Sequence, residues 1–251
     1  MIELKSEREI GYMREAGRIV AAVLRELAAA LRPGITTAEL DRLAERLIRE
    51  AGAEPAFKGY QGFPASICTS INDEVVHGIP SPHRVIREGD VVSIDVGARY
   101  HGYYGDSAAT FAVGAVPAEA ARLLEVTRRS LEEGIAAARA GNRLGDIGYA
   151  VQRYVEAAGF SVVRDYAGHG IGRAMHEDPQ VPNYGRPGTG LRLRPGLVIA
   201  IEPMVNAGGH AVRTDPDGWT VRTADGSLSA HFEHTVLITD GEPEVLTGGA
   251  F

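Results

Sequence analysis

The sequence predicts a fold that mixes helices with strands and is built from two related halves. The first observation is a helical hairpin that occurs twice, with matching residues such as Gly34 and Gly141 standing 107 positions apart. The second is a short apolar strand in each half that ends in an acid, Asp95 or Glu202, again 107 positions apart. A constant offset across separate elements indicates an internal duplication. We therefore expect a domain with pseudo-twofold symmetry.

Each half is expected to begin with two helices joined by a tight connection. In residues 7–31, apolar side chains recur at helical intervals until the break at Pro33. A second helix follows Thr36, whose hydroxyl suits an N-cap, and it ends at Gly52. The same pattern returns in the second half, where Gly159 stands 107 positions after Gly52.

The acids that end the two strands are candidate functional residues. Val91–Ile94 leads into Asp95, and Val198–Ile201 leads into Glu202, each after a glycine turn. An isolated acid is most often a solvated loop residue or a helix cap. At the end of a buried strand, however, an unpaired charge costs several kcal/mol. We therefore interpret these two acids as metal ligands.

Two further acids fall where hairpins would bring them beside the first pair. Asp95 and Asp106 lie on either side of a turn at Gly102–Gly105, so a tight hairpin would make their carboxylates meet. Like charges this close stay ionised only beside cations, and two divalent ions bridged by carboxylates would neutralise them. Glu202 and Glu233 repeat the arrangement in the second half.

A histidine completes the expected ligand set. His169 lies in Gly168-His169-Gly170-Ile171-Gly172, where the flanking glycines allow a ligand to approach closely. Four carboxylates and one imidazole form a mixed oxygen and nitrogen set, which suits Mn, Fe, Co or Zn. The ligand types do not choose among these metals.

The other histidines divide into two groups. His77 stands in Val76-His77-Gly78-Ile79-Pro80, and His176 stands in Met175-His176-Glu177-Asp178-Pro179. From the residues alone, either one could be a core histidine bonded to a backbone carbonyl or a functional residue. His83, His101 and His210 stand in polar stretches typical of loops.

The composition excludes several classes of function. A net charge of -7 argues against sequence-independent binding to nucleic acid, which depends on excess Lys and Arg. Cys68 is the sole cysteine, so an intramolecular disulfide and the usual cysteine-based zinc motifs are excluded. The first ten residues are charged where a signal peptide is apolar, and residues 19–31 are too short and too charged to span a bilayer. We expect a cytoplasmic protein without membrane contact.

Seven short motifs follow one another in a characteristic order along nearly the whole chain. They are Ser70-Ile71-Asn72 with His77-Gly78-Ile79-Pro80, Asp95-Val96-Gly97, Gly105-Asp106, Gly168-His169-Gly170-Ile171-Gly172, His176-Glu177-Asp178-Pro179, Ile201-Glu202-Pro203 and Phe232-Glu233-His234-Thr235. The combined set closely resembles methionine aminopeptidase type I. The resemblance implies the pita-bread fold, an α+β architecture with pseudo-twofold internal duplication and a central antiparallel sheet covered by helices. It also implies a single catalytic domain over residues 1–251.

The resemblance implies roles for the residues at matching positions. Two divalent metal ions would be held by Asp95, Asp106, His169, Glu202 and Glu233, with Asp106 and Glu233 bridging. His77 and His176 would contact the substrate without binding metal, which decides between the two interpretations left open above. The pocket for the first side chain would be formed by Tyr60, Phe63, Cys68, Met175 and Trp219. From the residues alone, Tyr60, Phe63 and Cys68 would be interpreted as packing on the core.

The implied activity is removal of the N-terminal methionine from nascent proteins and peptides with a small second residue. Water activated by two divalent ions, which are Co, Mn, Fe or Zn, would attack the first peptide carbonyl. Glu202 would move the proton toward the leaving amine, while His77 and His176 would hydrogen-bond the reacting amide. The expected partners are peptide and nascent-chain N-termini, with the ribosome as a further candidate. The chain is expected to be a monomer.

Two other functions fit parts of the pattern. Proline-specific aminopeptidases and prolidases share the domain but resemble longer chains with an additional N-terminal domain. A non-enzymatic binding module of the same fold would typically lack metal ligands, and none is missing here.

Four positions depart from the family pattern. Met175 replaces a common Phe, Phe57 stands where a smaller residue is frequent, and His231 and Phe232 replace a polar residue and a Tyr before Glu233. We expect these changes to tune the pocket width and the hydrogen bonds around the metal ligands.

Overall fold

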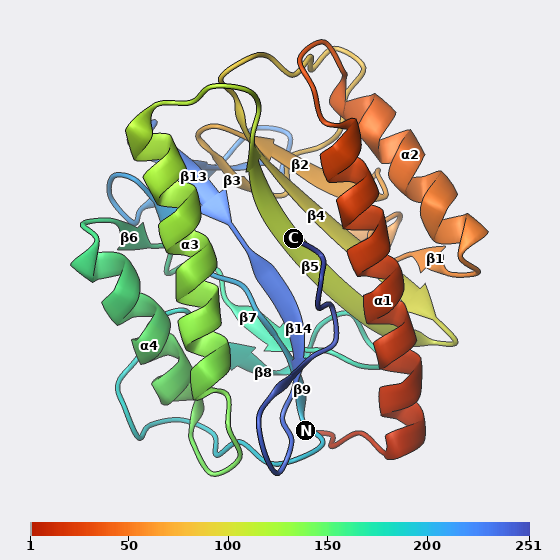
Figure 1. Cartoon of the computed structure of the whole chain (residues 1–251), viewed down its shortest axis with the longest axis vertical. Helices are drawn as coiled ribbons and strands as arrows, with labels where there is room; N and C mark the ends of the chain where they lie inside the picture. Colours follow the sequence, from red (N-terminus) through yellow and green to blue (C-terminus); the bar gives the residue numbers. More distant parts are fainter. Residues whose placement is uncertain (1) are drawn as a thin grey trace.

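A large antiparallel sheet lies at the centre of the computed structural model, which describes residues 2–251 (Figure 1). Its nine strands run in the order β1-β4-β5-β14-β9-β7-β8, with β2 beside β4 and β15 beside β14. They are β1 (Glu54–Pro55), β2 (Ile67–Ile71), β4 (Val91–Tyr100), β5 (Tyr103–Ala112), β7 (Gly168–Gly170), β8 (Glu177–Val181), β9 (Val198–Ile201), β14 (Glu233–Leu237) and β15 (Glu244–Val245). Met1, the first residue of the expected domain, lies outside the described residues.

Two three-stranded sheets extend the central one. The first has the order β13-β10-β6 and the second has the order β11-β12-β3. Their strands are β3 (Glu74–Val76), β6 (Ser161–Val162), β10 (Met204–Asn206), β11 (Val212–Thr214), β12 (Val221–Thr223) and β13 (Ser229–His231). The short strand β3 leads directly to His77, so this extension matters for the site.

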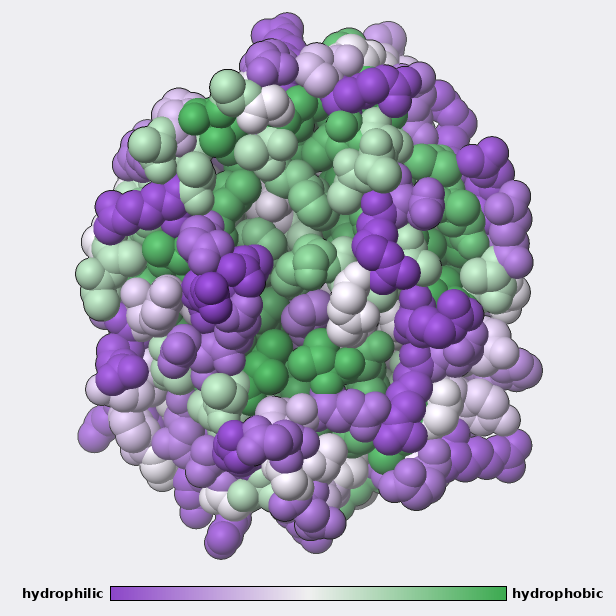
Figure 2. Space-filling model, viewed as in Figure 1, coloured by the Kyte–Doolittle hydropathy of each residue, from purple (hydrophilic) through white to green (hydrophobic). Residues whose placement is uncertain are grey.

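Helices cover one face of the central sheet (Figure 1). In the described part of the chain they are α1 (Glu7–Ala30), α2 (Thr37–Glu50), α3 (Ala118–Ala137) and α4 (Leu144–Ala157), with the short 3-10 helix η1 (Tyr60–Gly62) in a loop. Figure 2 shows that apolar residues gather along the middle of this face, between α1 and α3, while hydrophilic residues occupy its outer sides.

The expected duplication is present in detail. Helices α2 and α4 both begin and both end 107 positions apart, because Thr37–Glu50 maps onto Leu144–Ala157. Gly34 and Gly141 have φ values of 92° and 93°, a left-handed conformation that glycine adopts without steric cost. Their amides donate to carbonyls that are also 107 positions apart, those of Ile86 and Leu193. The constant offset therefore reflects one structural unit used twice.

The two faces of the central sheet carry different side chains, because residues alternate between the faces along each strand. Val92, Ile94 and Val96 of β4 belong to the buried core beneath the helices, together with Ile199 and Ile201 of β9. Successive strand residues point to opposite faces. Ser93 and Asp95 of β4, and the residue that follows Ile201, therefore point away from the helices.

The β4–β5 hairpin has a tighter turn than the sequence predicts. Strand pairing runs to Tyr100 and Tyr103, so the turn consists of His101 and Gly102 alone. Gly105 is a strand residue, and it is required for a different reason. A Cβ there would lie 2.9 Å from the backbone nitrogen of Gly17, because α1 crosses the hairpin at this point.

The described chain contains no helix long and apolar enough to cross a membrane. Cys68 is a buried free thiol.

Candidate functional site

Five adjacent strands of the central sheet position the predicted ligands, four of them within a strand and Glu202 directly after β9. Along the order β4-β5-β14-β9-β7, these residues are Asp95, Asp106, Glu233, Glu202 and His169. Gly97 pairs with Asp106, and His234 pairs with Ile201, so the alternation of side chains places all four acids on the face opposite the helices. The structure thus brings together every ligand that the sequence predicts.

The two aspartates lie too close together to be ordinary acids. Asp106 is buried, and one carboxylate oxygen of each aspartate is buried without a hydrogen-bond partner. Burial raises the pKa of Asp95 to about 6. Burial and repulsion from Asp95 raise the pKa of Asp106 well above its ordinary value. The fold therefore holds both carboxyl groups in positions where burial and mutual repulsion disfavour the ionised form.

The two glutamates complete the acidic cluster. Burial raises the pKa of Glu202 to about 8 and, with repulsion from Asp106, raises that of Glu233 well above its ordinary value. One oxygen of Glu233 is also buried without a partner. Four such acids on one face of a sheet require neutralisation by protons or by cations.

His169 is oriented as a ligand. Its Nδ1 lies 2.9 Å from the carbonyl oxygen of Gly170, and a carbonyl can only accept, so Nδ1 carries the proton. The lone pair of Nε2 is then free. Nε2 lies 3.8 Å from Asp106 and 3.6 Å from Glu202, and burial lowers the pKa of His169 to about 4. The ring is therefore neutral, as metal binding requires.

His231 lies in the same cluster. From the sequence, this residue is considered only as a neighbour of Glu233. Its buried Nε2 has no partner and lies 3.7 Å from Glu202 and 3.8 Å from Glu233. Burial lowers its pKa as well. His231 ends β13 and stands two residues before Glu233, which begins β14. Because residues two apart in an extended chain share a face, this spacing could have indicated that His231 points toward the acids.

A cavity of about 290 Å³ opens onto the acids. The acids line one end. Apart from Gln61 and three histidines, the rest of its wall consists of aromatic and sulfur-containing side chains. They include all five expected pocket residues, Tyr60, Phe63, Cys68, Met175 and Trp219. The rings of Phe63 and Trp219 meet edge to face at 5.1 Å. These residues therefore pack on one another, as expected from the residues alone, and they also enclose a cavity.

Two details of this cavity concern Phe57, which was expected to affect the pocket width, and the protonation of Cys68. Phe57 is buried in its wall and lies against Gly97, where a Cβ would approach the Phe57 ring to 2.6 Å. Burial, and then the negative charge of Asp95, raise the pKa of the Cys68 thiol well above its ordinary value. The thiol is therefore an uncharged apolar surface and not a nucleophile.

His77 lies beside the acids in a strained backbone conformation. Its φ of 62° is in the left-handed region, which non-glycine residues rarely adopt. The next residue fixes it, because Gly78 donates to Ser70 Oγ, and a Cβ on Gly78 would lie 2.0 Å from the Thr69 carbonyl oxygen. Burial lowers the pKa of His77 to about 4, so its ring is neutral.

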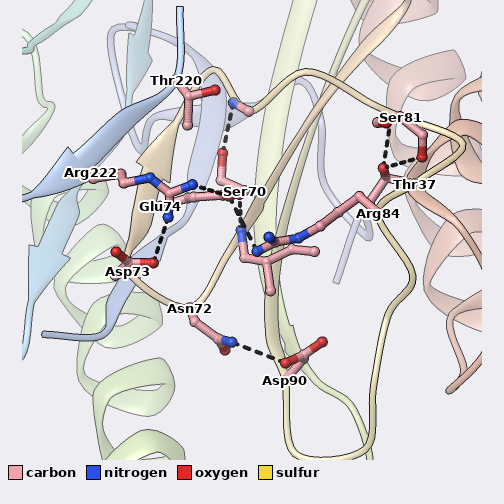
Figure 3. A network of polar contacts seen from close by, with 12 residues as sticks. Thr37, Ser70, Asn72, Asp73, Glu74, Ser81, Arg84, Asp90, Thr220 and Arg222 are labelled. Carbon is pink, nitrogen blue, oxygen red and sulfur yellow. Dashed lines mark hydrogen bonds and ion pairs between the residues drawn. The ribbon is translucent and has the colours of Figure 1, made fainter. Parts of the chain in front are cut away.

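A polar network holds the segment that carries His77 (Figure 3). The buried carboxylate of Glu74 accepts from the Ile71 amide at 2.7 Å and from Arg222 at 2.9 Å. Arg222 also donates to Asp73 at 2.8 Å. Arg222 lies on β12, shortly after Trp219, so the network ties the His77 segment to the strand that follows the pocket tryptophan.

His176 lies at the rim of the cavity. Its Nδ1 shares a hydrogen bond of 2.8 Å with the Tyr60 hydroxyl, and its ring centre is 4.2 Å from that of His169. Partial desolvation lowers its pKa. His77 and His176 therefore flank the acids, whereas His83, His101 and His210 are exposed in turns and bends.

A second cavity of about 320 Å³ meets the same acids from another direction. The two cavities share four lining residues, Asp95, Glu202, His77 and His176, and the second cavity is also lined by His231. Its other walls are more polar and include the exposed side chains of Arg164, Gln180 and Tyr184. The acids therefore stand between an apolar space and a polar one.

The cluster fits divalent metal ions. Oxygens of Asp95, Asp106 and Glu233 are buried without partners, and two groups of ligand atoms, from Asp106, His169 and Glu233 and from Glu202, His231 and Glu233, each lie within 4.8 Å of one another. An oxygen-rich set with neutral imidazole is the donor set that first-row divalent metals accept. Bound cations would satisfy the orphaned oxygens and remove the repulsion.

Comparison with known proteins finds close relatives over nearly the full chain. The family model described as metallopeptidase family M24 matches residues 11–240. A methionine aminopeptidase of Clostridium acetobutylicum is 59% identical over 98% of this chain and 99% of its own length. The crystal structure of methionine aminopeptidase from Thermotoga maritima has a TM-score of 0.97 and 49% identity, covering 98% of this chain and 99% of that chain. The fold expected from the sequence is thereby confirmed.

A proline-specific relative is more distant. The structure of an Xaa-Pro dipeptidase from Bacillus anthracis has a TM-score of 0.77 and 25% identity, covering 98% of this chain but 62% of that chain. The domain is shared, as expected, and the likeness is weaker.

The raised pKa values predict how pH affects the metal-free protein. Between the ordinary pKa of an acid and the raised values of about 6 for Asp95 and about 8 for Glu202, the folded state binds more protons than the unfolded state. The titration of these acids, and of Asp106 and Glu233, lowers the stability as pH rises through this window, and it opposes the smaller gain from histidines such as His77 and His169, whose pKa values are lowered. Urea unfolding of the EDTA-treated protein should give a lower free energy of unfolding at pH 8 than at pH 6. These two pH values correspond to the raised pKa values of Glu202 and Asp95. Added Mn should reverse the decline.

Glu202→Gln is the matched control for this experiment. The variant keeps the size of the side chain but removes the group that titrates near pH 8, so its metal-free stability should fall less over the same interval. A wild-type stability that is constant or rises between the two pH values would contradict the assignment of the buried acids.

Proposed function

The chain belongs to metallopeptidase family M24, and from that membership and the geometry of the site we propose that it removes the N-terminal methionine from peptides and nascent proteins. It is a metallo-exopeptidase of the methionine aminopeptidase kind. The observation that carries the proposal is the largely apolar cavity that is lined by all four acids, of which Asp106 and Glu233 are buried, and that accommodates one side chain of moderate size. We propose that residues 1–251 act as one catalytic domain.

Two divalent ions are proposed to bind Asp95, Asp106, His169, Glu202 and Glu233. The central position of Asp106 and Glu233 on neighbouring strands β5 and β14 supports the proposal that these two bridge the ions. The ions would lower the pKa of a water molecule and polarise the first peptide carbonyl. Co, Mn, Fe and Zn all suit this donor set, and cellular supply decides among them.

Glu202 is proposed to move a proton during the reaction. Its carboxylate stands between His169 and His231 at the meeting point of the two cavities. This position beside both cavities suits a group that accepts a proton from water and delivers it to the leaving amine.

The two flanking histidines are proposed to hydrogen-bond the reacting amide. Both rings are neutral, and each can donate one N–H to the carbonyl oxygen as it gains negative charge or accept from the amide. Tyr60 orients His176, and the strained backbone orients His77. Rigid placement of such donors before the reaction is what makes them effective.

The apolar cavity is proposed to select methionine. The edge-to-face pair of Phe63 and Trp219, with Cys68 and Met175, offers aromatic and sulfur contacts that suit a thioether. Phe57 narrows the cavity, and Met175 provides an unbranched, adaptable wall in place of an aromatic ring. These two departures therefore offset each other in part.

The polar cavity is proposed to take the rest of the peptide. Buried Met204 and His231 line this cavity together with Asp95 and Glu202, which supports a preference for a small second residue. Exposed polar side chains line its outer part, as an emerging peptide backbone requires. We propose that the chain acts in the cytoplasm as a monomer, on nascent chains at the ribosome, without contacting nucleic acid or membrane directly.

A peptide assay tests this function. Metal-stripped protein should release only the first residue of Met-Gly-Met-Met, and only after Co or Mn is added, with products identified by mass. An Xaa-Pro peptide in the same assay tests the proline-specific alternative. Cleavage confined to the Xaa-Pro bond would move the chain to that class, and inactivity with every metal would favour a non-enzymatic binding module.

The role of His77 gives a second test. His77→Ala should lower kcat by about a hundredfold or more, because a donor to the reacting amide is lost. Metal content by elemental analysis should not change. His83→Ala, which alters an exposed loop histidine, is the matched control and should keep the wild-type kcat. His77→Asn tolerates the left-handed backbone and separates loss of the ring from backbone strain. Loss of metal in either His77 variant would contradict this role.

A further inference from the structure

The N-terminal segment before α1 is anchored beside the catalytic site. We call residues 2–6 the N-terminal strap and residues 172–177 the histidine turn, because the turn carries His176. The backbone amide of Lys5 donates to the Gly196 carbonyl oxygen at 2.7 Å, which fixes the strap against the turn that precedes β9. The strap is therefore a held element of the fold.

A buried ion pair joins the strap to the histidine turn. Lys5 Nζ lies 2.6 Å from Glu177 Oε2, and the side chains are 2% and 16% exposed. The other oxygen of Glu177 accepts from the backbone amides of Arg173 at 2.7 Å and Ala174 at 3.1 Å. The Glu177 carboxylate thus stabilises the turn through two of its backbone amides and also binds Lys5.

The turn is built around this ammonium group. A Cβ on Gly172 would lie 2.3 Å from Lys5 Cε and 2.7 Å from Glu177 Oε1, so a side chain there would displace the ion pair. The Gly172 carbonyl oxygen accepts from the Tyr104 amide of β5 at 2.9 Å. The backbone therefore wraps closely around the charged pair.

A second contact joins the first turn of α1 to the histidine turn. Arg173 lies 3.1 Å from Glu9, which also accepts from the Tyr103 hydroxyl at 2.9 Å and caps α1 through Ser6. Arg173 is exposed, so this pair is worth little alone. The buried pair carries most of the constraint.

We propose that Lys5 and Glu177 are positioning residues that hold His176 in the reactive arrangement. The inference rests on the proposed function, because it assigns His176 a role in the reaction. His176 directly precedes Glu177, and its exposed ring is held by Tyr60 on one side and by the turn on the other. A shift of the turn would move the ring relative to the acids, and misplacement by about 1 Å can cost a large factor in rate.

Lys5→Met tests the proposal, since it keeps the length of the side chain and removes the charge. With metal-loaded protein and Met-Gly-Met-Met, kcat should fall about tenfold while KM changes little. Metal content and circular dichroism should match wild type. Arg14→Met, which removes an exposed ion pair of α1 with Glu244, is the matched control and should keep the wild-type kcat.

A double-mutant cycle with His176→Ala separates positioning from general stability. If Lys5 acts through His176, Lys5→Met should lower kcat by less than about twofold once His176 is gone. The same factor in both backgrounds, or a wild-type kcat in either single variant, would overturn the proposal. Glu177→Gln keeps the size of its side chain and replaces Lys5→Met in the cycle if that variant does not fold.

Failure of the proposed function has a different signature. A wild-type protein that releases no methionine with any metal contradicts the function itself and the strap proposal with it. A wild-type protein that is active but gives an additive cycle contradicts the strap proposal alone.

Discussion

The structure depends on keeping four carboxylates together on one buried face of a sheet. Ionised acids at this spacing repel one another, and burial removes the water that would otherwise screen them. The protein can satisfy them with protons or with divalent cations. Every further feature of the site, from the neutral histidines to the orphaned oxygens of Asp106 and Glu233, is consistent with the second solution.

The duplicated architecture explains how the acids reach one place. Each half supplies a helical hairpin that covers the sheet and a strand that positions an acid, so the pseudo-twofold relation brings Asp95 and Glu202 toward a common centre. The expectation that both strands end in the acid is wrong for Asp95, because β4 continues through it to Tyr100 in the long hairpin with β5, whereas Glu202 directly follows β9. The helices pack against the apolar side chains on one face of these strands. The side chains on the opposite face point away from the helices. The fold thus separates stability on one face from chemistry on the other.

Much of this could be predicted from the residues. The offset of 107 positions, the Thr36 cap and the acids after two apolar strands are local or periodic signals, and α2, α4, β4 and β9 carry them. Asp106 and Glu233 needed family resemblance, because an acid within or beside a strand has no distinctive local pattern. Their assignment as ligands stays a prediction.

Other features could not be predicted because they depend on contacts between distant segments. Lys5 is 172 positions from Glu177, and nothing in its neighbourhood distinguishes it from a surface lysine. Phe57 closes the cavity only because Gly97 leaves room for its ring. His231 was visible as an unusual residue, but its buried, unpaired nitrogen becomes evident only in three dimensions.

Anomalous diffraction from crystals grown with Mn would test the central claim most directly. The account predicts two anomalous peaks about 3.5 to 4 Å apart on the sheet face opposite the helices. They should be surrounded by Asp95, Asp106, His169, Glu202 and Glu233. Absence of peaks at this cluster, or a metal bound elsewhere while the four acids remain free, would contradict it.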